Sequence, residues 1–182
     1  MKTQVWAHRG ASAYAPENTL EAFRLAAEMG ADGVELDVQL SRDGELVVAH
    51  DETIDRVSSG TGYIKDYTLA QLKKLSFNRL FPKFKDARIP TLKEVYELLK
   101  PAGLTVNVEL KTGIILYPEI EEKVLALTAS MGMEDRVIYS SFCHPSLVRL
   151  KELDSGLKTG LLYSDGWIGA ADYGRRTVGA DG

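Results

Sequence analysis

The sequence alternates between short segments with the periodicity of strands and longer segments with the periodicity of helices. Strands are predicted at 5–8, 34–40, 105–110, 137–142 and 159–163, where apolar residues alternate with polar ones or form short runs. Most segments between them place apolar residues three and four positions apart, as amphipathic helices do. Strands separated by helices indicate βαβ units and a parallel sheet. Such connections favour either an open doubly wound sheet or a barrel.

Composition excludes several other classes of protein. With 182 residues, 45% hydrophobic and 26% charged, the chain can bury a sizeable core and is neither fibrous nor disordered. No apolar run is long enough for a transmembrane helix. A net charge of −4 without basic runs argues against nucleic acid as a partner. The single cysteine, Cys143, cannot form an internal disulfide, and the first residues lack the pattern of a secretory signal, so we expect a cytoplasmic protein.

Capping patterns predict where two helices begin. Asn18 followed by Glu21, and Thr91 followed by Glu94, have the spacing of a capping box. Residues 51–88 are the least regular part of the sequence, rich in Ser and Gly near their start and with one short helix predicted. We interpret them as a small insertion over one end of a single domain that spans residues 1–182.

One short segment occurs twice. Residues 29–33 (MGADG) lead into the strand predicted at 34–40, and residues 178–182 (VGADG) nearly repeat them. The repeat is either a coincidence of turn-forming residues or the sign of a (β/α)n array. A complete (β/α)8 barrel takes about 250 residues. The sequence therefore predicts a TIM barrel of which this chain would stop before the last three strands.

Two of the predicted strands alternate apolar side chains with acidic ones. Glu35 and Asp37 lie opposite the apolar face of 34–40, and Glu109 lies opposite that of 104–110. In a barrel covered by helices, the apolar face meets the helices and the polar face points inward. Burying unpaired carboxylates would cost several kcal/mol each. These side chains therefore need a positively charged partner.

A divalent cation is one such partner. The Cα atoms of Glu35 and Asp37 are about 6.6 Å apart in an ideal strand, so both carboxylates can converge on one ion that Glu109 approaches from a neighbouring strand. Oxygen ligands favour Mg²⁺ or Ca²⁺ over Zn²⁺. Alternatively, the acids lie on a solvated face or pair with Lys and Arg. The same pattern in two strands makes this alternative weaker.

Histidines and cations follow the predicted strands. His8 and His50 each end an extended segment, where the active sites of parallel α/β folds lie, and a pair of histidines can serve as general base and general acid. A structural role is the commoner alternative for a single histidine, and for His144 both interpretations stay open. Arg9 and Lys111 could neutralise a phosphate ester beside a metal ion or could be ordinary surface charges.

Together these residues resemble a known family. His8-Arg9-Gly10, Pro16-Glu17-Asn18-Thr19, Glu35-Leu36-Asp37-Val38, Val48-Ala49-His50-Asp51 and Glu109-Leu110-Lys111 are similar, in matching order, to the motif series of the glycerophosphodiester phosphodiesterases. The resemblance runs from about Val5 to Tyr163. It implies a TIM-barrel, metal-dependent phosphodiesterase that releases an alcohol and glycerol 3-phosphate from a small glycerophosphodiester.

The resemblance also implies a role for each candidate residue. His8 and His50 would form the acid/base pair, Glu35, Asp37 and Glu109 would bind one divalent cation, and Arg9 and Lys111 would contact the phosphate. Residues 51–88 correspond to a small insertion near the substrate entrance of the family.

Two other functions stay open from the sequence. The chain could be a non-catalytic fragment or binding module that dimerises through exposed sheet edges. It could also be another metal hydrolase on a TIM barrel, which is weaker because the first strand has no His-x-His ligand pair. The alcohol head group, the metal and homo-oligomer formation are not determined by the sequence.

Overall fold

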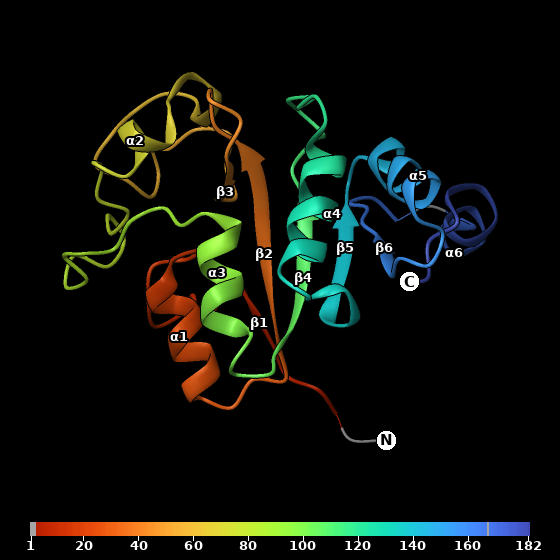
Figure 1. Cartoon of the computed structure of the whole chain (residues 1–182), viewed down its shortest axis with the longest axis horizontal. Helices are drawn as coiled ribbons and strands as arrows, with labels where there is room; N and C mark the ends of the chain where they lie inside the picture. Colours follow the sequence, from red (N-terminus) through yellow and green to blue (C-terminus); the bar gives the residue numbers. More distant parts are fainter. Residues whose placement is uncertain (1–2, 167) are drawn as a thin grey trace.

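The core of the protein is a sheet of parallel strands. The computed structural model describes residues 3–166 and 168–182. Over these residues, the parallel strands pair in the order β1 (Trp6–His8), β2 (Gly33–Leu40), β4 (Thr105–Leu110), β5 (Val137–Ser141) and β6 (Thr159–Leu161). A further strand, β3 (Leu46–Val48), pairs antiparallel with β2. The predicted parallel α/β sheet is therefore confirmed (Figure 1).

Helices connect the parallel strands and pack on one face of the sheet (Figure 1). The longer ones are α1 (Leu20–Glu28), α3 (Leu92–Leu99), α4 (Ile120–Ser130) and α5 (His144–Leu153), with α1 against α3 and α4 against α5. The short helices α6 (Ala170–Tyr173) and η3 (Gly174–Val178) follow β6, and η2 (Glu134–Arg136) precedes β5. In the part of the chain that the structure describes, no helix is both long and apolar enough to cross a membrane.

The apolar faces of the strands form the core beneath these helices. The side chains of Leu36 and Val38 in β2 and Val108 in β4 are fully buried in one cluster with Phe23 of α1 and Val95 of α3. Burial of each such side chain stabilises the fold by about 1.5–3 kcal/mol relative to exposure. The acidic and amide side chains between them therefore lie on the other face of the sheet, as the alternation predicts.

The start of α3 agrees with its predicted cap, whereas the cap predicted for α1 is wrong. The hydroxyl of Thr91 accepts a hydrogen bond from the backbone N–H of Glu94 at 3.2 Å, and the carboxylate of Glu94 accepts one from Thr91 at 2.7 Å. For α1 the cap is Thr19, whose hydroxyl accepts from the backbone of Ala22. Asn18 instead has a φ of 56°, and this left-handed conformation turns its side chain away from the helix start.

Residues 51–88 pack around a second apolar cluster, which they share with residues just before and after them. They contain only the short helices η1 (Ile64–Asp66) and α2 (Leu69–Leu72) between irregular segments. The cluster comprises Val47, Ala49, Ile54, Ile64, Leu72, Phe77 and Ile89. In Figure 1 this segment lies beside β3, near the carboxyl end of β2. Its description as an insertion in a larger domain stays a prediction.

The sequence repeat is also a structural repeat. The backbone N–H of Asp32 donates to the carbonyl of Val5 at 2.9 Å, and its carboxylate accepts from the N–H of Val5 at 2.8 Å. Asp181 makes the same two contacts with Thr159, both at 2.9 Å. In each copy the following glycine also donates to the same carbonyl. The two copies therefore make the same contacts, the first with the residue just before β1 and the second with the start of β6, which favours the (β/α)n array over a coincidence.

Replacing Gly10 by Ala should destabilise the fold strongly. Gly10 follows β1 with a φ of 76°, and a Cβ atom there would lie 2.7 Å from the backbone carbon of Ala22 in α1. The left-handed conformation costs about 1–2 kcal/mol, and the clash adds about 1–3 kcal/mol. Chemical denaturation should show a loss of about 2–5 kcal/mol in the free energy of unfolding.

Gly103→Ala is the matched control. Its φ is 74°, but nothing lies within 4 Å of a Cβ atom at this position. Only the conformational cost of about 1–2 kcal/mol should remain. Equal losses in the two variants would show that the contact between the β1 turn and α1 is not close.

Candidate active site

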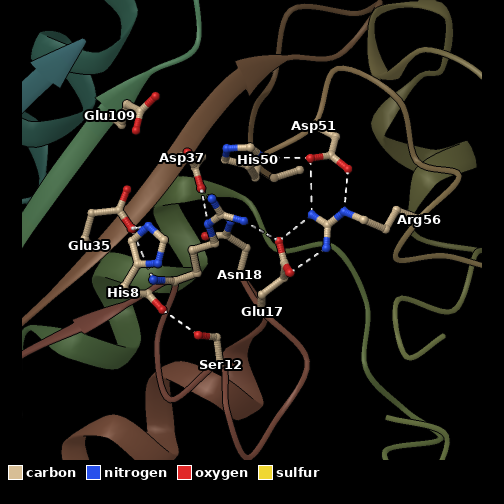
Figure 2. Close-up of polar contacts among 12 residues, drawn as sticks. His8, Ser12, Glu17, Asn18, Glu35, Asp37, His50, Asp51, Arg56 and Glu109 are labelled. Atoms are coloured by element: carbon tan, nitrogen blue, oxygen red, sulfur yellow. Dashed lines mark hydrogen bonds and ion pairs between the residues drawn. The ribbon is translucent and has the colours of Figure 1, made fainter. Parts of the chain in front are cut away.

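Three carboxylates from two adjacent strands meet on the polar face of the sheet. In the parallel pairing of β2 and β4, Asp37 is the direct partner of Glu109. Each of Glu35, Asp37 and Glu109 offers an oxygen atom, and these atoms lie within 4.8 Å of one another. The side chains of Asp37 and Glu109 are only 1% and 10% exposed. This acidic triad is the centre of the candidate site (Figure 2).

The electrostatics of the acidic triad favour a bound cation. Burial and the neighbouring Asp37 raise the pKa of Glu35 to about 8. Burial and the charge of Asp37 also raise the pKa of Glu109, although Lys111 opposes this shift. The Oδ1 atom of Asp37 is buried and accepts no hydrogen bond from the described residues. Hard cations bind oxygen ligands, and a carboxylate oxygen that accepts no hydrogen bond and lies beside two other carboxylates is suited to this role.

Two cationic side chains border the acidic triad. The Nζ atom of Lys111, just beyond β4, lies 3.0 Å from Glu109 and 3.8 Å from Asp37. In a continuous strand, Arg9 would point to the face opposite that of His8. A role of Arg9 in contacting phosphate therefore requires the strand to end at His8, which it does: β1 ends there and Arg9 has a φ of 56°. Its Nε atom lies 3.6 Å from Asp37. Both cationic side chains can therefore contact a molecule bound at the triad.

The two candidate histidines approach the triad from different directions. His8 ends β1, and its Nε2 atom lies 3.7 Å from a carboxylate oxygen of Glu35. Partial burial and the adjacent Arg9 lower the pKa of His8. Figure 2 shows His8 beside Glu35, with His50 on the other side of Asp37.

His50 reaches the site for a reason other than the one predicted. β3 runs antiparallel to β2, so its end is not among the carboxyl ends of the parallel strands. Instead the chain folds back along β2, and the backbone N–H of Ala49 donates to the carbonyl of Asp37 at 3.0 Å. This antiparallel return places His50 beside the acidic triad.

His144 has a structural arrangement of contacts. One ring nitrogen lies 3.1 Å from the hydroxyl of Tyr173, and the other lies 3.0 Å from the carbonyl of Leu162. Since both nitrogens have partners in the segment after β6, this side chain ties the start of α5 to that segment and to α6. Of the two interpretations, the structure favours the structural one.

Two polar residues of the site are assigned no catalytic or binding role from the sequence. The amide of Asn18 donates to the carboxylate of Asp37 at 2.8 Å, which holds one oxygen of the acidic triad. Gln39 is fully buried and donates to the carbonyls of Ala49 and Asp51 at 2.9 and 2.8 Å. Asn is a residue type that often caps helices, so local rules assign Asn18 to the start of α1 instead of to the site. Gln39 shares the face of Glu35 and Asp37, which is the signal that could have identified it.

Three further charged residues form a network beside the triad. Arg56 donates to the carboxylates of Glu17 and Asp51, with its closest contact to each at 2.7 Å. Asp51 in turn lies 2.6 Å from Nδ1 of His50. Glu17 and Asp51 belong to two of the sequence motifs that carry the family resemblance. Arg56 belongs to none of them and lies in the irregular segment 51–88, where no periodicity indicates which way a side chain points.

The comparisons with known proteins agree on one class. A profile of the glycerophosphoryl diester phosphodiesterase family matches residues 8–178. A glycerophosphodiester phosphodiesterase from Caldanaerobacter subterraneus subsp. tengcongensis is 53% identical over 169 residues, which cover 92% of this chain and 70% of that protein.

Solved structures give the same result. A phosphodiesterase from Oleispira antarctica, in complex with the product sn-glycerol-3-phosphate, superposes with a TM-score of 0.84 at 32% identity, over 98% of this chain and 72% of that one. A glycerophosphodiester phosphodiesterase from Agrobacterium tumefaciens superposes with a TM-score of 0.79 at 36% identity, over 87% of this chain and 66% of that one.

The fold and the acidic triad thus define a phosphodiesterase of the TIM-barrel class, as predicted. More particularly, the chain belongs to the glycerophosphoryl diester phosphodiesterase family. It spans about two thirds to three quarters of the length of the relatives described above. The predicted family and enzyme class are confirmed.

Binding of a divalent cation should stabilise the protein through Asp37. A ligand that binds only the folded state at 100 times its Kd adds about 2.7 kcal/mol to the free energy of unfolding. We expect Mg²⁺ or Ca²⁺ to raise the Tm of the wild-type protein, and Asp37→Asn to remove this increase. Differential scanning fluorimetry with and without the ion measures it.

Glu122→Gln is the control, because Glu122 lies on α4 and pairs with Arg149 away from the triad. This variant should keep the wild-type response to the ion. An ion-dependent increase in Tm that survives in Asp37→Asn would mean that the cation binds elsewhere.

Proposed function

We propose that this protein hydrolyses small glycerophosphodiesters to an alcohol and glycerol 3-phosphate. The acidic triad carries the proposal, because the cationic side chains of Arg9 and Lys111 and the rings of His8 and His50 (Figure 2) surround it. The structural relative from Oleispira antarctica, whose bound product is sn-glycerol-3-phosphate, supports the same reaction. The alcohol released from the diester is not specified by these residues.

The metal ligands in this proposal are Glu35, Asp37 and Glu109. Their oxygen atoms favour Mg²⁺ or Ca²⁺. A bound divalent cation would polarise a phosphoryl oxygen of the substrate. The side chain of Asn18 holds one oxygen of Asp37, so the other stays directed into the acidic triad.

Arg9 and Lys111 bind the phosphodiester in this proposal. Both side chains are largely buried, at 19% and 12% exposure, so their charges are less screened than those of surface cations. Each also lies within 4 Å of a carboxylate that would hold the cation. The phosphoryl group would therefore be oriented between these two side chains and the triad.

His8 and His50 exchange the protons. Because the pKa of His8 is lowered, its ring is neutral near pH 7 and can accept a proton from the nucleophile. His50 would then donate a proton to the leaving alkoxide. Water and a glycerol hydroxyl of the substrate are both compatible with this scheme as nucleophiles.

Removing any of the proposed residues should abolish most of the turnover. General acid–base catalysis contributes about 10²–10⁴-fold. We expect His8→Ala and His50→Ala each to lower kcat for glycerophosphocholine by at least about 100-fold, and Glu109→Ala to lower it by a similar amount. Steady-state kinetics in Mg²⁺ or Ca²⁺ measure these losses, and circular dichroism checks that the fold is intact.

The alternative function, a non-catalytic binding module, makes a different prediction. It expects no metal-dependent hydrolysis by this chain and a dimer through the exposed sheet edges. Size-exclusion chromatography with light scattering measures the mass. Near-wild-type turnover in His8→Ala, His50→Ala and Glu109→Ala would contradict the catalytic and metal-binding roles proposed for these residues.

Location and domain organisation complete the proposal. A single cysteine, which cannot form an internal disulfide, supports a cytoplasmic location. The second apolar cluster, distinct from the main core, supports the interpretation of residues 51–88 as a small insertion, and the contact between Arg56 and Glu17 supports its position at the substrate entrance.

A further inference from the structure

A continuous chain of hydrogen bonds connects the two sides of the site. It runs from Arg9 to Glu17. From there it continues to Arg56, Asp51 and His50, the residues labelled in Figure 2. The distances along it lie between 2.6 and 3.0 Å at the closest atoms. Its central member comes from the insertion, whereas the ends are proposed phosphate-binding and acid/base residues.

The contact between Asp51 and His50 determines which ring nitrogen faces the substrate. Burial alone would raise the pKa of Asp51, but hydrogen bonds from Arg56 and His50 lower this pKa to about 2. An ionised carboxylate only accepts hydrogen bonds. The Nδ1 atom of His50, 2.6 Å away, must therefore carry a proton in both charge states of the ring. The proton exchanged with a substrate is then the one on Nε2.

Arg56 has the geometry to hold Asp51 in this orientation. Its Nε and Nη2 atoms donate to the two oxygens of Asp51 at 2.7 and 3.2 Å. Its Nη1 and Nη2 atoms donate to the two oxygens of Glu17 at 2.7 and 2.8 Å. A planar guanidinium can bind two carboxylates in this way, which the point charge of a lysine cannot.

The backbone of His50 is held independently of Arg56. The buried amide of Gln39 donates to the carbonyls of Ala49 and Asp51, and the hydroxyl of Tyr117 donates to Gln39 at 2.9 Å. A change at Arg56 therefore leaves the path of the chain in place and acts on the side chain of Asp51.

We propose that Arg56 is a positioning residue, which, anchored on Glu17, orients Asp51 so that His50 keeps its proton on Nδ1 and presents Nε2 to the substrate. The same logic operates in the serine-protease triad, where an aspartate holds a histidine in its working tautomer. The proposal rests on the proposed function for the role of His50 as an acid/base residue. The tautomer itself does not depend on that role.

Nitrogen NMR of the imidazole rings tests the tautomer directly. In the ¹⁵N-labelled wild-type protein with neutral rings, Nδ1 of His50 should have the chemical shift of a protonated nitrogen. In Asp51→Ala and Arg56→Met, we expect the proton to move towards Nε2, the tautomer that a free imidazole prefers. His50→Gln assigns the signals.

Kinetics test the consequence for the reaction. Loss of a residue that orients a functional side chain typically lowers activity about 10- to 100-fold, and we expect this loss in kcat for Arg56→Met, with little change in KM. Arg56→Lys should recover only part of it. Because Arg56 acts through Asp51, the double variant with Asp51→Ala should be no slower than Asp51→Ala alone.

Arg149→Met is the matched control. Arg149 also contacts two carboxylates, those of Glu122 and Glu152, and is 50% exposed compared with 41% for Arg56. It lies on α5, away from the site. Its replacement should leave both kcat and the His50 signals unchanged.

The outcomes separate this inference from the proposed function. Unchanged His50 signals in Arg56→Met would overturn the inference, even if the variant were slow or less stable. A shifted tautomer with wild-type kcat would also overturn it. If the wild-type protein hydrolyses no glycerophosphodiester, the proposed function fails, whereas the NMR result still decides whether Arg56 controls the tautomer.

Discussion

The repulsion between three buried carboxylates is the constraint on which the rest of the site depends. Glu35, Asp37 and Glu109 share one face of β2 and β4 because the other face is needed for the apolar core. The parallel register then brings Asp37 and Glu109 directly together. Cationic side chains only partly offset this concentration of negative charge, so the same arrangement that costs stability prepares a site for a divalent cation.

The surrounding loops supply what the strands cannot. A regular strand directs neighbouring side chains to opposite faces, so His8 and Arg9 can both serve one site only because the backbone changes conformation at Arg9. Likewise the antiparallel return of β3 brings His50 beside β2. Backbone geometry at the ends of short strands therefore assembles side chains that an ideal sheet would keep apart.

Periodic segments are the part of this protein that sequence reasoning predicts well. The apolar alternation in 34–40 and 105–110 correctly indicates both the core face and the acidic face, since period and burial are coupled in a strand. Asn18 shows the limit of local rules: its residue type suits a helix cap, but a left-handed backbone directs it to Asp37. Arg56 lies where no period exists, so its two carboxylate partners could not be foreseen.

By itself, the sequence determined the parallel α/β class, the apolar and acidic faces of the central strands and the family of the chain, because these follow from short-range periodicity and from motifs in a set order. Only the tertiary structure decided which groups contact one another. It paired Asp37 with Glu109, brought His50 in by an antiparallel strand and joined Glu17 to Asp51 through Arg56. The physical reason is that such contacts depend on register and loop conformation, which are set by packing between residues distant in the chain.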